Sequence, residues 1–285
     1  MTESTSRKSQ RVQTLHKRVE EIIRQERTNH SRPEALRKIL SVIDLTSLSG
    51  QETRDDIRAL CNMAKGSLAL HSDIPSAAAI CIFPEHVSLA KEELGDTDVL
   101  VATVAGGFPG GDTPTALKVK EVQDAVAAGA DEIDMVMNYN RLLAGDLGAV
   151  HDDIAQVKSA CRDLDLKVIL ETGRLGTPDK VRQAAEIAIE AGADFIKTST
   201  GKTEPAATEE AALVMLQVIR DYYRTTGIFI GFKPAGGIRE PVQAFRYLSL
   251  VYHVLGGQWL TPSLFRIGAS QLYSRAADEL KAIRT

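Results

Sequence analysis

Two segments of the sequence begin with the same four residues and continue as short apolar runs. Residues 128–137 read AGADEIDMVM, and residues 191–200 read AGADFIKTST. In both segments the glycine follows a helical pattern, at the place where a C-terminal cap is expected. A strand-like run begins directly after the aspartate. The repeat predicts a helix–turn–strand unit that recurs along the chain.

The same alternation of strand-like and helical segments extends over most of the chain. Strands that are separated by helices pair in parallel, and eight such units over about 240 residues favour a (β/α)₈ TIM barrel. A doubly wound open sheet is the main alternative. The expected strands are Val42–Leu48, Ala77–Phe83, Val99–Val104, Glu132–Asn138, Lys167–Thr172, Asp194–Thr200, Ile228–Lys233 and Arg266–Ser270, and the expected helices include Thr115–Ala128, Val150–Arg162, Pro178–Ala191 and Thr208–Tyr223.

The first forty residues differ from the rest of the chain. They contain ten Lys or Arg against five Asp or Glu, a local charge of +5 in a chain whose net charge is −4. Apolar residues recur at helical spacing between residues 10 and 29, which predicts an amphipathic helix. There is no apolar core or small-residue cleavage site of a secretory signal. We therefore expect a helical extension over residues 1–40, docked on a single barrel formed by residues 41–285.

Composition narrows the class of protein. The 285 residues are 44% hydrophobic and 25% charged, which excludes a disordered or collagen-like chain. The mild acidity argues against nucleic-acid binding, and no apolar run approaches the roughly 18 residues of a membrane helix. Cys61, Cys81 and Cys161 form no CxxC pair, which favours a reducing compartment. We expect a cytoplasmic protein with neither nucleic acid nor membrane as partner.

Three charged residues stand inside expected strands, where apolar side chains are the rule. Lys197 and Lys233 lie on neighbouring strands, and Asp134 lies on the fourth strand. Neighbouring strands are about 4.8 Å apart, so two inward ammonium groups would lower the pKa of at least one of them. A neutral amine attacks a carbonyl to form a Schiff base, and a carboxylate can move the protons. The three residues favour aldolase chemistry over a purely structural ion-pair cluster.

Glycine-rich segments follow the last three expected strands. They are Thr198–Lys202, Pro234–Ile238 and Gly268–Ser270. Barrels often bind phosphate at loops after strands seven and eight, through backbone N–H groups that glycine leaves accessible. We therefore expect a phosphate group at this end of the barrel. The tail Gly201–Thr203 resembles a P-loop, but its required leading glycine is replaced by Ile196.

No pattern indicates a metal or an organic cofactor. The six histidines show no HxH or HExxH spacing, the cysteines form no pair, and no GxGxxG follows the first strand. The sequence therefore predicts a reaction that uses neither.

The motifs taken together resemble the deoxyribose-phosphate aldolases over residues 40–275. The resemblance implies reversible Schiff-base cleavage of 2-deoxy-D-ribose 5-phosphate to D-glyceraldehyde 3-phosphate and acetaldehyde, a lyase reaction of deoxyribonucleotide catabolism. The sugar phosphate and acetaldehyde would be its small-molecule partners. Apart from the resemblance, a homodimer is our expectation for the assembly. The residues that carry the resemblance are Ile43–Thr46, Ile80–Pro84, Val101–Val104, Glu132–Val136, Glu171–Gly173, Phe195–Lys202 and Gly231–Gly237.

The resemblance also assigns roles to single residues. It implies that Lys197 forms the Schiff base, that Lys233 tunes the pKa of Lys197 and relays protons, and that Asp134 donates and accepts protons. The residues that it implies for the 5-phosphate are Gly201, Lys202, Gly236, Gly237 and Ser270, and those that it implies for the cavity lining are Asp44, Thr46, Cys81 and Thr200.

The sequence departs from the family pattern in two places. Gln271 stands where relatives often have a second serine, and the chain ends at Thr285 without the terminal tyrosine found in some relatives. The N-terminal helix is longer than a minimal barrel requires.

Two other functions remain open: another lysine-dependent barrel aldolase for a different sugar phosphate, and a catalytically silent barrel that binds a phosphate ligand.

Overall fold

The computed structural model describes residues 2–26, 31–66 and 73–283, with side chains from residue 12 onward. The described residues form eight parallel strands in one sheet, in the order β7-β6-β5-β4-β3-β2-β1-β8. Isolated bridges from Phe232 to Phe265 and from Ala235 to Gly268 join the two ends of this sheet. The strands are β1 (Ile43–Thr46), β2 (Ala79–Ile82), β3 (Leu100–Val104), β4 (Glu132–Val136), β5 (Asp165–Ile169), β6 (Phe195–Lys197), β7 (Gly231–Lys233) and β8 (Ile267–Ala269).

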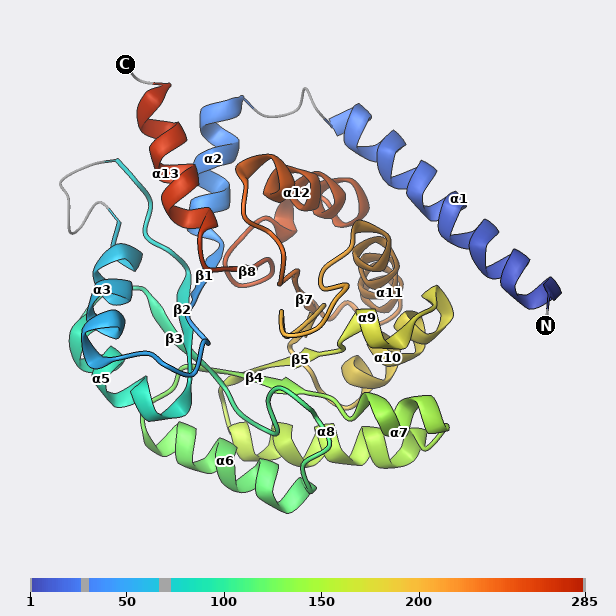
Figure 1. Ribbon diagram of the computed structural model, residues 1–285, viewed down its shortest axis with the longest axis horizontal. Helices are drawn as coiled ribbons and strands as arrows, with labels where there is room; N and C mark the ends of the chain where they lie inside the picture. The colour runs from blue at the N-terminus through green and yellow to red at the C-terminus, as the bar shows by residue number, and fades with distance from the viewer. Residues whose placement is uncertain (1, 27–30, 67–72, 284–285) are drawn as a thin grey trace.

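Helices surround this nearly closed barrel (Figure 1). Side-chain caps mark several helix starts: the hydroxyls of Thr53, Thr177 and Thr208 accept N–H bonds from the first turn. The helices are α1 (Thr2–Glu26), α2 (Arg32–Ser41), α3 (Arg54–Ala64), α5 (Val87–Leu94), α6 (Thr115–Ala127), α7 (Tyr139–Ala144), α8 (Leu147–Cys161), α9 (Thr172–Leu175), α10 (Pro178–Glu190), α11 (Glu209–Thr226), α12 (Pro241–Leu255) and α13 (Leu272–Ala282), with short 3₁₀ turns at Pro84–His86 and Gly257–Trp259.

The predicted (β/α)₈ barrel is confirmed. Consecutive strands are neighbours from β1 to β7, and β8 pairs with β1, whereas an open doubly wound sheet would reverse its strand order. Every strand overlaps its expected segment and is shorter than expected, and β5 begins two residues earlier, at Asp165. The sixth, for example, was expected over Asp194–Thr200 and spans Phe195–Lys197. The strands were predicted too long because apolar and β-branched residues continue into the loops, beyond the last ladder hydrogen bond.

The N-terminal helix α1 packs on the outside of the barrel, against α11 and α12. It was expected over residues 10–29; it begins earlier, at Thr2, and residues 27–29 lie outside the described part. Val19, Ile22 and Ile23 form its buried stripe. The guanidinium of Arg246 on α12 binds both Glu20 of α1 at 2.5 Å and Glu209 of α11, which joins the three helices.

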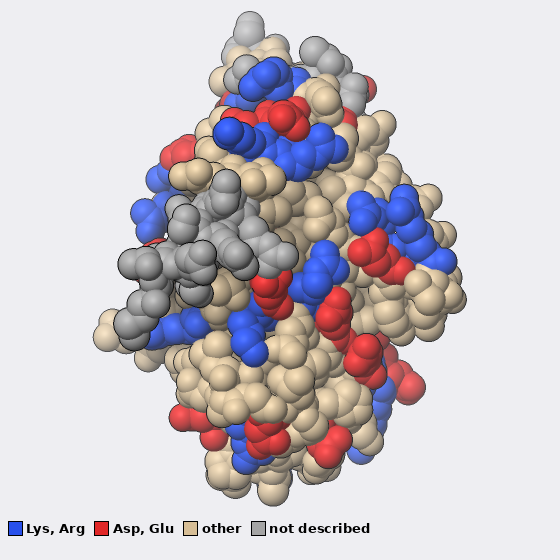
Figure 2. All heavy atoms as spheres, turned by 90° about the vertical axis from the view of Figure 1, so that its right-hand side faces the viewer, with Lys and Arg blue, Asp and Glu red and all other residues tan. Residues whose placement is uncertain are grey.

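The described surface carries charges of both signs. Figure 2 shows the face on the right-hand side of Figure 1, where basic and acidic side chains are interspersed among uncharged residues. Within the described ranges, no helix combines the length and the apolar character needed to cross a membrane.

The interior of the barrel has two chemically different halves. Alternate residues of β2 and β3 form an apolar cluster that is separate from the main core: Ala79, Cys81, Ala102 and Val104, with Leu48 beside them. The strands on the other side carry buried charged residues instead. Because side chains alternate between the two faces of a strand, the outward residues of the same strands build the core beneath the helices.

A close contact between β6 and β7 fixes one wall of the charged half. Phe195 pairs with Gly231 in the ladder, and the phenyl ring is 1% exposed. A Cβ atom on Gly231 would lie 2.3 Å from this ring, so only glycine leaves room for it.

We expect Gly231→Ala to destabilise the protein by about 1–3 kcal/mol, because the ring or the strand must shift to relieve the overlap. Gly148→Ala is the matched control, since it adds the same methyl group on α8 where no atom lies within 4 Å. Urea unfolding should show a loss for the first variant and none for the second. Equal free energies of unfolding would contradict this description of the barrel wall.

Candidate active site

Two lysines share one carboxylate oxygen inside the barrel. The register of β6 and β7 pairs Lys197 with Lys233, so their side chains enter the barrel at the same height. Each Nζ lies 2.7 Å from Oδ2 of Asp134, which projects from β4. Asp134 and Lys233 are completely buried and Lys197 is 3% exposed. The structure thus brings together the three residues that the sequence singled out as strand-embedded charges.

The two lysines have different surroundings. Lys233 forms a second ion pair, with Oδ2 of Asp44 on β1. Burial alone would lower the pKa of Lys233, but attraction by Asp134 and Asp44 outweighs it and raises that pKa well above the usual range. Among the carboxylates that the structure describes, Lys197 contacts Asp134 alone. Lys233 is therefore held as an ammonium ion, whereas Lys197 has only a share of one carboxylate.

The carboxylates are held in their ionised forms. Burial would raise the pKa of Asp134, yet the ammonium groups of Lys197, Lys233 and Lys167 together hold it well below its usual range. Burial opposes ionisation of Asp44 in the same way, and Lys233 and Arg266 lower the pKa of its carboxyl. Asp134 therefore acts near neutral pH as a hydrogen-bond acceptor that can take up a proton only briefly.

Three further buried charges, which the sequence analysis did not select, complete this network. Lys167 on β5 binds Glu132 at 2.6 Å and lies 3.5 Å from Oδ1 of Asp134. Arg266, directly before β8, binds Asp44 and Glu132, each at 2.7 Å. A signal was present in the sequence: Glu132 stands two residues before Asp134, on the same face of the strand. Lys167 and Arg266 are also cations within expected strands, as Lys233 is.

The predicted cavity-lining residues lie at different depths. Cys81 is buried beside the network, with its sulfur 3.9 Å from Asp134 Oδ2. Thr46 is its ladder partner on β1, and the Thr46 hydroxyl donates to the Asp44 carbonyl at 2.8 Å. Thr200 lies beyond β6, where its hydroxyl donates to Glu171 at 2.5 Å and accepts the N–H of Lys202. These two hydrogen bonds of the Thr200 hydroxyl hold the loop after β6 in place.

The glycine-rich loops converge at the carboxyl ends of the last three strands. A Cβ atom on Gly236 would lie 2.7 Å from Ala206 Cβ and 3.0 Å from Gly201 Cα, so the loops after β6 and β7 touch there. Both glycines have positive φ, +76° at Gly201 and +90° at Gly236. The exposed Ser270 directly follows β8, whose Gly268 bridges Ala235. The predicted phosphate-binding residues thus come from loops that meet.

Lys202 connects this loop cluster to the opposite side of the barrel mouth. Its ammonium group donates to the backbone carbonyl of Leu48, in the loop after β1. The side chain is therefore placed over the rim of the barrel, where it adds a positive charge beside the converging glycine turns.

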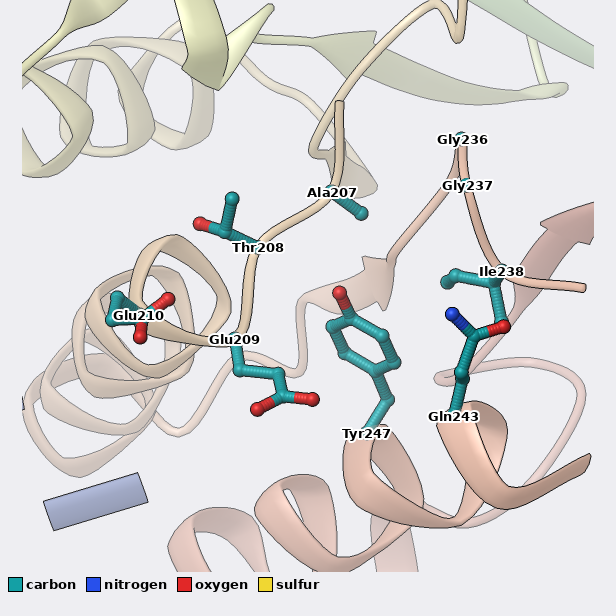
Figure 3. A pocket seen from close by; sticks show the side chains of 9 residues that line it. All are labelled: Ala207, Thr208, Glu209, Glu210, Gly236, Gly237, Ile238, Gln243 and Tyr247. Carbon is teal, nitrogen blue, oxygen red and sulfur yellow. The ribbon is translucent and has the colours of Figure 1, made fainter. Parts of the chain in front are cut away.

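A pocket lies between the turn Gly236–Gly237 and helices α11 and α12 (Figure 3). It encloses about 220 Å³, and the hydroxyl of Tyr247 points into it toward the loops. Glu209 on its wall is held by Arg246. Its lining residues are Ala207, Thr208, Glu209, Glu210, Gly236, Gly237, Ile238, Gln243 and Tyr247.

Comparison with known proteins identifies the family. The sequence profile of the DeoC/LacD family aldolases matches residues 38–246. The chain belongs to the DeoC/LacD family of aldolases. The predicted resemblance is thereby confirmed. The buried lysines Lys197 and Lys233 thus lie in the barrel of a member of an aldolase family. Among the described residues, no three His, Cys, Asp or Glu side chains are grouped as metal ligands would be.

Several relatives within this aldolase family are named for one substrate. The chain is 46% identical to human deoxyribose-phosphate aldolase over 249 residues, which cover 84% of this chain and 78% of the relative. The mouse enzyme of the same name is 45% identical over the same coverage. The solved tetrameric deoxyribose phosphate aldolase of Aeropyrum pernix is 25% identical, with a TM-score of 0.64, and the match covers 93% and 97% of the two chains.

The three cysteines should be unreactive in the native protein. All are buried, and burial raises the pKa of Cys61 and Cys81 to about 11 and that of Cys161 to about 12. Because the thiolate is the reactive form, labelling by a thiol reagent near neutral pH should be slow until the protein unfolds. All three should label in urea. Native labelling of Cys81 as fast as that of a free thiol would contradict the burial of its side chain.

Proposed function

We propose that the protein catalyses the reversible cleavage of 2-deoxy-D-ribose 5-phosphate to acetaldehyde and D-glyceraldehyde 3-phosphate through a Schiff base on Lys197. The observation that supports this most directly is the single oxygen of Asp134 shared by Lys197 and Lys233. Lys233 is paired with two carboxylates, Asp44 and Asp134, whereas Lys197 is paired with Asp134 through that one oxygen. The relatives named for this substrate agree with the proposal.

The proposed reaction begins when the neutral amine of Lys197 attacks C1 of the open-chain sugar. Loss of water from the carbinolamine gives a protonated imine. The C3 hydroxyl then loses its proton as the C2–C3 bond breaks, and the electron pair moves into the imine to form an enamine. D-glyceraldehyde 3-phosphate leaves. Protonation of the enamine at C2 and hydrolysis by water release acetaldehyde and restore the amine.

Asp134 is the proposed proton carrier for these steps, directly and through water. It lies 2.7 Å from the reacting nitrogen, and its lowered pKa suits it to accept a proton and pass it on at once. Lys233 keeps its positive charge beside the same oxygen, which disfavours a second full positive charge on Lys197. In this proposal Lys233 acts mainly through its charge.

The phosphate of the substrate is proposed to bind at the converging loops. Gly201, Gly236 and Gly237 lie in the loops after β6 and β7. Barrels of this type often hold phosphate at the loops after strands seven and eight. Lys202 adds a positive charge, and Ser270 lies at the end of β8. Asp44, Thr46, Cys81 and Thr200 are proposed to shape the cavity between this site and Lys197.

We further propose a cytoplasmic homo-oligomer with a dimer as its minimal unit, in which residues 41–285 form the catalytic barrel and residues 1–40 an accessory helical extension. The buried free thiols fit a reducing compartment. The relative from Aeropyrum pernix is tetrameric, which supports self-association within the family.

Reductive trapping tests the proposed nucleophile. With acetaldehyde and borohydride, the wild-type chain should gain one ethyl group, and peptide mass spectrometry should place it on Lys197. Lys197→Ala should lose the adduct and the release of acetaldehyde from deoxyribose 5-phosphate. A panel of pentose and hexose phosphates, and deoxyribose without phosphate, tests the substrate. Full trapping in Lys197→Ala, or preference for a different sugar phosphate, would refute the corresponding part of the proposal.

Lys233→Met tests the role of the neighbouring charge. Without Lys233, Asp134 is left to pair with Lys197, so Lys197 should be held more firmly as an ammonium ion. We expect kcat/KM to fall roughly 100-fold or more near neutral pH, and the rising limb of the pH–rate profile to move to higher pH. A variant with reduced rate but an unchanged pH profile would show that Lys233 does not act through its charge.

A further inference from the structure

The buried network contains more positive than negative side chains. Four cationic side chains, Lys167, Lys197, Lys233 and Arg266, share three carboxylates, Asp44, Glu132 and Asp134. None of the seven is more than 3% exposed. Counted in their ordinary ionised forms, they leave one positive charge without a counter-charge. A buried uncompensated charge is expensive, so the network is balanced when one amine is neutral.

The contacts decide which amine that is. Lys233 has both Asp44 and Asp134, and Lys167 has Glu132 at 2.6 Å with Asp134 at 3.5 Å. Arg266 bridges Asp44 and Glu132 with three contacts between 2.7 and 3.1 Å. Lys197 alone depends on a single oxygen, and that oxygen is already occupied by Lys233.

We infer that Lys167 and Glu132 are positioning residues that set, by charge balance, the protonation of the reacting amine. Lys167 on β5 binds Glu132 and lies 3.5 Å from the second oxygen of Asp134. Its positive charge therefore already balances negative charge near Lys197. Glu132 in turn keeps Lys167 and Arg266 in place. Neither residue needs to touch the substrate. The inference rests on the proposed role of Lys197 and extends it to a pair of residues one layer deeper in the barrel.

The effect has a predicted sign for each residue. Loss of the Lys167 charge leaves three cations against three carboxylates, and Lys197 then completes the balance as an ammonium ion. Loss of the Glu132 charge leaves four cations against two carboxylates, which disfavours the ammonium form further. The charged and titratable groups of this buried network and its immediate neighbours, besides Lys197, are Asp134 and Glu132 from β4, Lys167 from β5, Lys233 from β7, Asp44 from β1, Cys81 from β2 and Arg266 next to β8.

The test is the pH dependence of kcat/KM for acetaldehyde release, whose rising limb reports the ionisation of the free enzyme. Lys167→Met should move the limb to higher pH and Glu132→Gln should move it to lower pH, each by about one pH unit, the size expected for a unit charge at this depth. The double variant should return the limb to the wild-type position. Lys167→Arg, which keeps the charge, should leave it there as well.

Lys118→Met is the matched control. Lys118 is also fully buried and binds Asp153 at 2.7 Å, but this pair lies between α6 and α8, outside the barrel. Its loss should lower the melting temperature without moving the limb. If Lys167→Met and Glu132→Gln move the limb in the same direction, or no further than Lys118→Met does, the inference is overturned.

Two readouts keep the conclusions separate. Should Lys167→Met fail to fold, Glu132→Gln and the double variant decide. A rising limb that moves to lower pH in Glu132→Gln and returns to the wild-type position in the double variant supports the inference. A limb that does not move in Glu132→Gln, or that moves to higher pH, overturns it. Trapping of wild-type Lys197 with acetaldehyde tests the proposed function alone. Successful trapping with unmoved limbs refutes only the charge-balance role, whereas no trapping refutes the proposed nucleophile itself.

Discussion

Oδ2 of Asp134 accepts hydrogen bonds from two lysine nitrogens in an interior from which bulk water is excluded, and the arrangement of the barrel follows from that demand. Each nitrogen lies 2.7 Å from the oxygen. Removing one member of a buried ion pair typically costs about 3–5 kcal/mol, because the charge left behind has no partner. The donors must therefore be held rigidly. Parallel pairing of β6 with β7, and the entry of Asp134 from β4, supply that rigidity.

The composition of the barrel interior makes room for this network. Lysine and arginine have long side chains, and four of them enter from β5 to β8. The strands β2 and β3 contribute small residues on the facing side, such as Ala79, Cys81 and Ala102. A barrel of eight strands has just enough interior space to be filled by side chains, so long residues on one side require short ones on the other. Lys197 is the last residue of β6, so it lies at the carboxyl end of the barrel, where the loops with Gly201 and Gly236 meet.

Much of this could be predicted from the sequence, for reasons that are physical. Parallel strands need crossover helices, so the alternating pattern indicated a barrel, and charges inside strands marked Lys197, Lys233 and Asp134. The ends of the strands could not be predicted, since they depend on where the ladder bonds stop: β6 ends at Lys197 although Thr198–Thr200 favour a strand. Lys167, Glu132 and Arg266 were missed because their importance lies in pairing across strands, which a single segment does not reveal.

The central claim is that Lys233 carries the positive charge and Lys197 is the amine that can be neutral. Neutron diffraction from deuterium-exchanged crystals of the free enzyme, at mildly alkaline pD, tests it most directly because it counts the deuterons on each nitrogen. An ammonium group carries three and a free amine two. The account predicts three on Nζ of Lys233 and two on Nζ of Lys197. Three on Lys197, or two on Lys233, would contradict it.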